Sequence, residues 1–158
     1  MLSAEALKKI DREVAKYPAG KQQSAVMSAL GIAQAEKGWL TAEVMDFVAD
    51  YLQMPPVAVY EVATFYTMYD REAVGRNKLC ICTNLPCALS GAKEAAAHLK
   101  ARLGIDWNET TADGRFTLKE GECFGACGDA PVLLVNNRRM EIDMRPERID
   151  ALLAELSR

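Results

Sequence analysis

The sequence lacks the features that mark several large classes of protein. Its 158 residues carry 19 lysines and arginines against 22 aspartates and glutamates, so no basic excess points to a nucleic-acid partner. The longest aliphatic run, Val132 to Val135, is far too short to span a bilayer. The N-terminus has neither the basic nor the apolar segment of a signal peptide. We therefore expect a soluble, cytoplasmic protein with no nucleic-acid partner and no direct membrane insertion.

Motifs for nucleotide binding and for thiol catalysis are also missing. No G-x-G-x-x-G follows an expected strand and no glycine-rich phosphate loop is present, so this chain should not bind NADH or flavin by itself. The C-x-x-C spacing of a dithiol catalyst is absent. The single histidine, His98, is expected on a helix surface, and a Rieske centre needs two histidines. We predict no catalytic residues in this chain.

Cysteine is the residue type around which the second half of the chain is organised. Cys82 and Cys87 are spaced C-x4-C, and Cys123 and Cys127 are spaced C-x3-C. The first pair begins a stretch without any charged side chain as far as residue 92, and glycines surround the second pair. Glycine lets a loop fold back tightly or approach a bound group closely. Both segments are therefore suited to enclose a small inorganic group.

Clustered thiols in a reducing compartment favour metal binding or catalysis over disulfides. The four paired cysteines predict a [2Fe–2S] cluster, one per chain, held by four thiolates. A single zinc ion bound by the same thiolates is the main alternative, since zinc sites tolerate two to four residues between ligands. The fifth thiol, Cys80, is expected to be a small buried side chain on the same strand face as Cys82.

Charges around the second pair bear on the reduction potential. One positive charge, Lys119, and three negative ones, Glu120, Glu122 and Asp129, lie near the second pair in sequence. No charged residue lies between the two cysteines of the first pair. Negative surroundings oppose the addition of an electron, so we predict a low potential, at roughly −400 mV.

Residues 1–72 are predicted to form an N-terminal all-helical bundle. Apolar residues recur at helical spacing, and capping residues mark the ends. Thr41 is the expected N-cap of one helix, and Pro56 opens another at its first position. The expected helices cover residues 3–17 and 20–37, a third follows Thr41 with its apolar face from Val44 to Tyr51, and a fourth runs from Pro56 to Met68.

Residues 73–158 are predicted to form a second domain with strands and helices. The expected strands cover residues 78–82, 115–119, 132–135 and 140–144, and the expected helices cover 91–103 and 146–156. The order β-α-β-β-β-α indicates a small mixed sheet with helices against it, close to a thioredoxin-like fold. The fold class is therefore α+β or α/β, with both cysteine pairs in loops at one end of the sheet.

These residues resemble a known family, the 24-kDa-type (E-type) [2Fe–2S] subunit of NADH:quinone oxidoreductase, respiratory complex I. The matching stretches are Cys82-Thr83-Asn84-Leu85-Pro86-Cys87 running on to Gly91-Ala92, Glu122-Cys123-Phe124-Gly125-Ala126-Cys127-Gly128-Asp129-Ala130-Pro131, Tyr17-Pro18, Ala33-Gln34, Gly38-Trp39-Leu40 and Val62-Ala63-Thr64-Phe65-Tyr66. The resemblance covers residues 17–144 and implies a helical bundle followed by a thioredoxin-like ferredoxin domain. It implies [2Fe–2S] ligands at Cys82, Cys87, Cys123 and Cys127 and favours iron over zinc.

The resemblance also implies partners. The family's cluster exchanges electrons with the FMN of an NADH-oxidising partner subunit, so FMN and NADH belong to that partner, and the large iron–sulfur subunit is a further expected neighbour. The whole would be an NADH dehydrogenase in which this chain has no complete activity alone, in a complex peripheral to the inner face of the cell membrane. Two alternatives remain: the equivalent diaphorase subunit of a soluble NAD-linked hydrogenase or formate dehydrogenase, and a zinc-stabilised interaction module.

Overall fold

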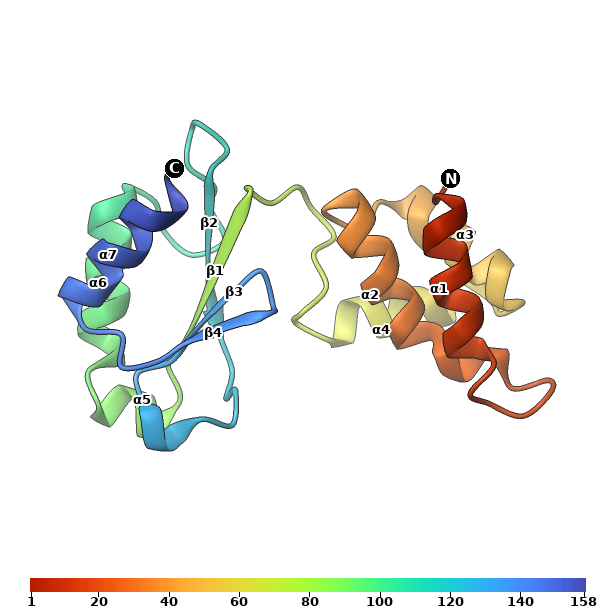
Figure 1. Cartoon of the computed structure of the whole chain (residues 1–158), viewed down its shortest axis with the longest axis horizontal. Coiled ribbons are helices and arrows are strands. Elements are labelled where there is room, and N and C mark those ends of the chain that lie inside the picture. Colours follow the sequence, from red (N-terminus) through yellow and green to blue (C-terminus); the bar gives the residue numbers. More distant parts are fainter. The chain divides into compact units, whose positions relative to one another are not determined.

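The computed structural model describes all 158 residues and divides into two compact units, Met1–Ala73 and Val74–Arg158. The first unit is built from helices alone, and the second contains the only sheet (Figure 1). No helix in either unit combines the length and the apolar character that crossing a bilayer requires.

The first unit contains four α-helices and one short 3-10 helix. They are α1 (Ala4–Val14), η1 (Gln22–Ala25), α2 (Val26–Lys37), α3 (Ala42–Leu52) and α4 (Pro56–Phe65). The helix starts follow from local chemistry. The hydroxyl oxygens of Ser3 and Thr41 accept hydrogen bonds from backbone N–H groups in the first turns of α1 and α3, each at 3.1 Å. Gly38, at φ 86°, ends α2 in a conformation that other residues adopt with strain.

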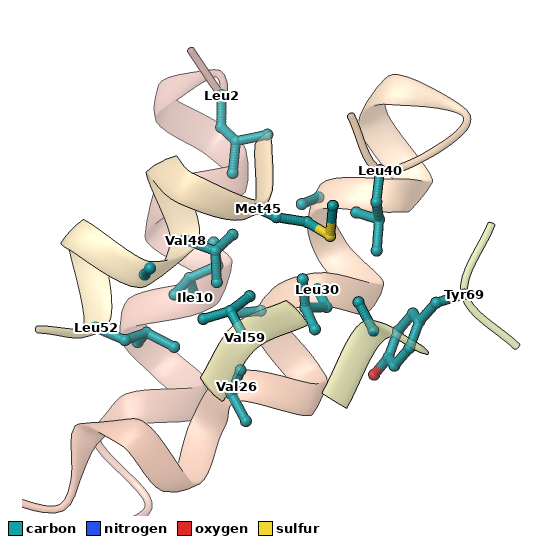
Figure 2. Packing of buried hydrophobic residues seen from close by; sticks show 14 of the residues in the cluster. Leu2, Ile10, Val26, Leu30, Leu40, Met45, Val48, Leu52, Val59 and Tyr69 are labelled. Atoms are coloured by element: carbon teal, nitrogen blue, oxygen red, sulfur yellow. The ribbon is translucent and has the colours of Figure 1, made fainter. Parts of the chain in front are cut away.

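The core of this unit forms where the four helices face one another. Ile10, Leu30 and Leu52 from three helices are at most 1% exposed, and Val59 of α4 closes the cluster (Figure 2). Tyr69, beyond the last helix, packs against the same cluster and donates a hydrogen bond to the carbonyl of Met27 at 2.7 Å. The chain leaving α4 is therefore fixed to the bundle by both apolar and polar contacts.

Three helix predictions in this unit were wrong in their extent. The helix expected over 3–17 ends at Val14. The helix expected over 20–37 begins with the separate 3-10 turn η1, so the α-helix starts only at Val26. The helix after Pro56 ends at Phe65, and Met68 lies outside it with 38% of its surface exposed.

The second unit is built on a four-stranded mixed sheet. Its strands are β1 (Asn77–Cys82), β2 (Phe116–Gly121), β3 (Leu133–Val135) and β4 (Arg139–Glu141), in the order β2-β1-β3-β4. The central strand β1 is parallel to β2 and antiparallel to β3. This arrangement confirms the predicted mixed sheet, but the strand expected over 140–144 was wrong in its extent, because β4 ends at Glu141.

One face of the sheet is covered by α6 (Ala92–Leu103) and α7 (Pro146–Leu156), which lie on the same side in Figure 1. Leu79 and Ile81 of β1 point to this face and are fully buried with Leu99 of α6 and Ile149 of α7. Because side chains alternate along a strand, Cys80 and Cys82 belong to the opposite face. The buried face thus fixes the register of the strand that carries the first thiol of the candidate site.

Candidate metal centre

The first thiol pair is placed by the end of the central strand and by a single helical turn. Cys82 is the last residue of β1, and Cys87 lies within α5 (Leu85–Leu89). Both thiols are almost completely buried, at 2% and 1% exposure, and pack with Ala92 and Val132. Pro86 lies in the first turn of α5, where a missing N–H costs nothing.

The second pair lies on an exposed loop that follows β2. Cys123 and Cys127 are both exposed, and Cys127 begins the 3-10 turn η2 (Cys127–Asp129). Their sulfur atoms are 3.8 Å apart. Gly125 lies between them at φ 79°, and its N–H donates to the Cys123 sulfur at 3.4 Å. A glycine at this position lets the loop reverse tightly enough to bring both sulfurs to one place.

The sulfur separation fits two thiolates on one tetrahedral metal. With metal–sulfur bonds of about 2.3 Å, tetrahedral geometry separates two sulfurs by about 3.8 Å. No three histidine, cysteine, aspartate or glutamate side chains, the four thiols included, are arranged to hold a single metal ion. Four thiols in two pairs suit a binuclear cluster in which each iron takes two thiolates.

Electrostatic interactions connect the two pairs. Burial raises the pKa of the Cys82 thiol, and the neighbouring Cys87 and Cys123 raise that pKa further, against a lowering by the backbone N–H of Asn84. A hydrogen bond with Cys123 is the main cause that raises the pKa of Cys127. Crowding of groups that would each carry negative charge is the common reason. Metal ions bind thiolates, so binding at these four sulfurs releases protons.

Backbone and side-chain contacts hold the two ligand segments together. Cys82 pairs with Gly121 across the β1–β2 ladder, and the Thr83 N–H donates to the Gly121 carbonyl at 3.4 Å. The Thr83 hydroxyl donates to the Glu120 carboxylate at 2.7 Å. Thr83, which follows Cys82, is therefore hydrogen-bonded directly to the end of β2, which leads to Cys123.

An open polar cleft of about 530 Å³ lies beside these segments. It is lined by Thr83, Asn84, Trp107, Asn108, Glu120 and Glu122. The carboxylates of Glu120 and Glu122 place negative charge in this cleft.

Several sequence predictions about this region need correction. Only Cys123 lies in irregular chain, because Cys82 ends a strand, Cys87 is helical and Cys127 starts a 3-10 turn. Cys80 is partly exposed rather than buried. His98 lies on α6 as expected, and its Nε2 is 2.9 Å from Asp150 Oδ1 on α7.

A family profile described as thioredoxin-like [2Fe–2S] ferredoxin matches residues 10–157. The NADH-quinone oxidoreductase E subunit of Rickettsia bellii is 41% identical over 144 residues, which cover 90% of this chain and 86% of that protein. An E subunit of the same enzyme from Rhizobium meliloti is 44% identical over 144 residues, covering 91% and 84%. The chain belongs to the thioredoxin-like [2Fe–2S] ferredoxin family, of the 24-kDa type. Family membership confirms the predicted [2Fe–2S] cofactor.

Two further likenesses are to a mitochondrial subunit and to a solved structure. A mitochondrial NADH dehydrogenase [ubiquinone] flavoprotein 2 from Dictyostelium discoideum is 43% identical over 134 residues, which cover 84% of this chain and 54% of that one. A crystal structure of an NAD⁺-reducing [NiFe]-hydrogenase chain matches with a TM-score of 0.69 at 23% identity. That match covers 81% of this chain but only 22% of the hydrogenase chain, so it bears on the fold alone.

Proposed function

We propose that this chain is the [2Fe–2S] electron-transfer subunit of an NADH-quinone oxidoreductase, with Cys82, Cys87, Cys123 and Cys127 as the cluster ligands. The observation that carries the proposal is the coincidence of two paired thiol sites with about 40% identity to an NADH-quinone oxidoreductase E subunit over most of its length. When bound, the cluster supplies a one-electron site. The chain carries no nucleotide motif, so hydride chemistry belongs to a partner.

The two thiol pairs differ in burial, so the proposed site has one enclosed side and one side open to solvent. Cys82 and Cys87 are enclosed by the second unit, whereas Cys123 and Cys127 are open to solvent. Electron transfer needs a short distance to the partner's redox group, and the exposed pair offers the side on which another protein can approach. We infer that this side faces the FMN-carrying, NADH-oxidising subunit.

The surface beside the buried pair supports a protein contact. Leu85 and Leu89 of α5 are 70% and 80% exposed, and no charged side chain occurs from Cys82 to Ala92. Depletion of charge and exposure of large apolar side chains are typical of interface cores. The flavin-carrying subunit and the large iron–sulfur subunit are the partners that we propose, in a complex held at the inner face of the cell membrane.

The chain's own groups tune the site. The Gly125 N–H donates to the Cys123 sulfur, and such donors stabilise added negative charge. Glu120 and Glu122 act in the opposite sense by placing negative charge at the neighbouring cleft. We propose that the carboxylates prevail and keep the potential low, at roughly −400 mV.

The test is made on the chain purified in its native complex. NADH is added under anaerobic conditions and the chain's EPR signal is compared in wild type and in a Cys127→Ser variant, with Cys80→Ser as the matched control. We expect loss or a changed line shape in Cys127→Ser and an unchanged signal in Cys80→Ser. An identical signal in Cys127→Ser contradicts the ligand assignment. A catalytic subunit of hydrogenase type in the purified complex would contradict the NADH-quinone oxidoreductase assignment.

A further inference from the structure

Gly121 stands at the junction of the two ligand segments. It is the last residue of β2, it is buried, and it pairs with Cys82 across the ladder. Two residues later the chain reaches Cys123. The backbone at Gly121 is therefore the shortest covalent and hydrogen-bonded path between the buried thiol pair and the exposed one.

The space above Gly121 is already filled. A Cβ added there would lie 2.8 Å from the Cys80 sulfur and 3.2 Å from Phe124 Cε1, with Phe124 Cζ closer still. Real side chains do not approach this closely, so both the Phe124 ring and the Cys80 sulfur have to move. The φ angle of Gly121 is not in the left-handed region. Space alone, and not backbone strain, excludes a side chain at this position.

Phe124 belongs to the exposed loop but its side chain does not stay there. It lies between Cys123 and Gly125 in sequence, is half-buried, and packs against the cluster formed by Cys82, Cys87 and their neighbours. The other apolar loop side chain between the ligands is the small Ala126. An aromatic ring buries far more surface than a methyl group, so Phe124 is the main apolar anchor of this loop.

We propose that Phe124, whose ring lies over Gly121 and packs against the buried thiol pair, positions Cys123 and Cys127 for the [2Fe–2S] cluster. The Phe124 ring connects the exposed loop to the buried thiol pair. Because Gly121 has no side chain, the ring can occupy the space above it. Phe124 and Gly121 are positioning residues, because neither supplies a ligand. This inference rests on the proposed ligand set.

The test measures how fast an iron chelator strips the cluster from the reconstituted full-length chain. Substitution of a residue that supports a metal ligand indirectly lowers metal affinity by about 10- to 100-fold. We expect Gly121→Ala and Phe124→Ala each to speed iron release about tenfold and to change the EPR line shape, with an unchanged far-UV CD spectrum. Gly128→Ala is the matched control, since an added Cβ meets nothing within 4 Å and the φ is ordinary. Its release rate should stay within about twofold of wild type.

A double-mutant cycle distinguishes a common effect of Gly121→Ala and Phe124→Ala on the ring position from two independent defects. If Gly121→Ala acts by displacing the ring, it should add little once the ring is gone, so the double variant should release iron at about the rate of Phe124→Ala alone. Multiplied effects, or single-variant rates within about twofold of wild type, overturn the inference. Should Gly121→Ala fail to fold, Phe124→Ala decides by its own release rate and line shape.

The outcome separates this inference from the proposed function. Serine at Cys123 or Cys127 that leaves the cluster signal unchanged refutes the ligand set itself. Serine variants that lose or alter the signal, together with a silent Phe124→Ala, refute only the positioning role.

Discussion

Removing the cluster should expose two of the four proposed ligands to alkylation and leave the other two protected by the fold. Cys123 and Cys127 are exposed, whereas Cys82 and Cys87 are 2% and 1% exposed. In the loaded chain all four sulfurs would be bound to iron. Treatment of the full-length chain with iodoacetamide before and after chelator treatment should therefore give a different pattern for each pair.

The expected contrast follows from burial. Alkylation of a buried thiol requires local opening, and an opening free energy of about 3 kcal/mol slows the reaction by roughly 100-fold. Burial also raises the pKa of Cys82, which lowers its thiolate fraction. The pKa of Cys127 is raised by its neighbour Cys123, so its own alkylation is slowed as well. The alkylation rate of each cysteine is therefore compared between the chain with the cluster and the chain without it.

Peptide mapping by mass spectrometry measures the modification of each cysteine with time. We expect Cys123 and Cys127 to change from protected to reactive on cluster removal, and Cys82 and Cys87 to remain slow in the empty chain until denaturant is added. Cys80, which is not a proposed ligand, is followed in the same digest. Equal reactivity of Cys123 in loaded and empty chains would refute its assignment as a ligand.

Three further predictions concern stability and redox tuning. Burial raises the pKa of Tyr69 to about 12 from an ordinary value near 10. The contribution of Tyr69 to the free energy of unfolding is therefore intact below pH 10, and about 2–3 kcal/mol is lost as the pH rises to 12. Urea unfolding of Tyr69→Phe should lack this pH dependence, and a pH profile equal to that of the wild type contradicts the prediction. Leu118→Ala, at a fully buried position of the sheet core, should lower the free energy of unfolding by about 2–5 kcal/mol in denaturant titrations, and a loss below about 1 kcal/mol would refute the packing described. Glu122→Gln should raise the reduction potential by roughly 10–40 mV in a redox titration, because it removes one screened negative charge; a fall in potential would reverse the proposed role of the cleft.

The sequence was sufficient for elements whose signals are local. Thr41 as an N-cap, Pro56 at the start of α4, and Pro146 at the start of α7 all lie where their backbone chemistry predicts. The change of pattern at Lys78 to Cys82 likewise predicted β1. Each of these signals depends on residues within one or two turns of the chain.

The parts that were missed depend on contacts between distant residues or on very short elements. The helix α5 spans five residues, too few for a periodic pattern to show. The order of the strands depends on packing, and so do the half-buried position of Phe124 and the close approach of Cys80 to Gly121. Residue type suggested a buried Cys80, but the structure leaves it partly exposed. Sequence therefore indicated which sulfurs are paired, and only the structure shows that one pair is buried and the other open.

The most direct test of the account is a metal analysis with EPR on the anaerobically purified full-length chain. Iron and zinc are quantified per chain, and spectra are recorded before and after dithionite. We predict two irons, no zinc, no signal in the oxidised chain and a spin-half signal after reduction. A colourless chain with one zinc and no signal in either state would contradict the electron-transfer function and support a structural metal site.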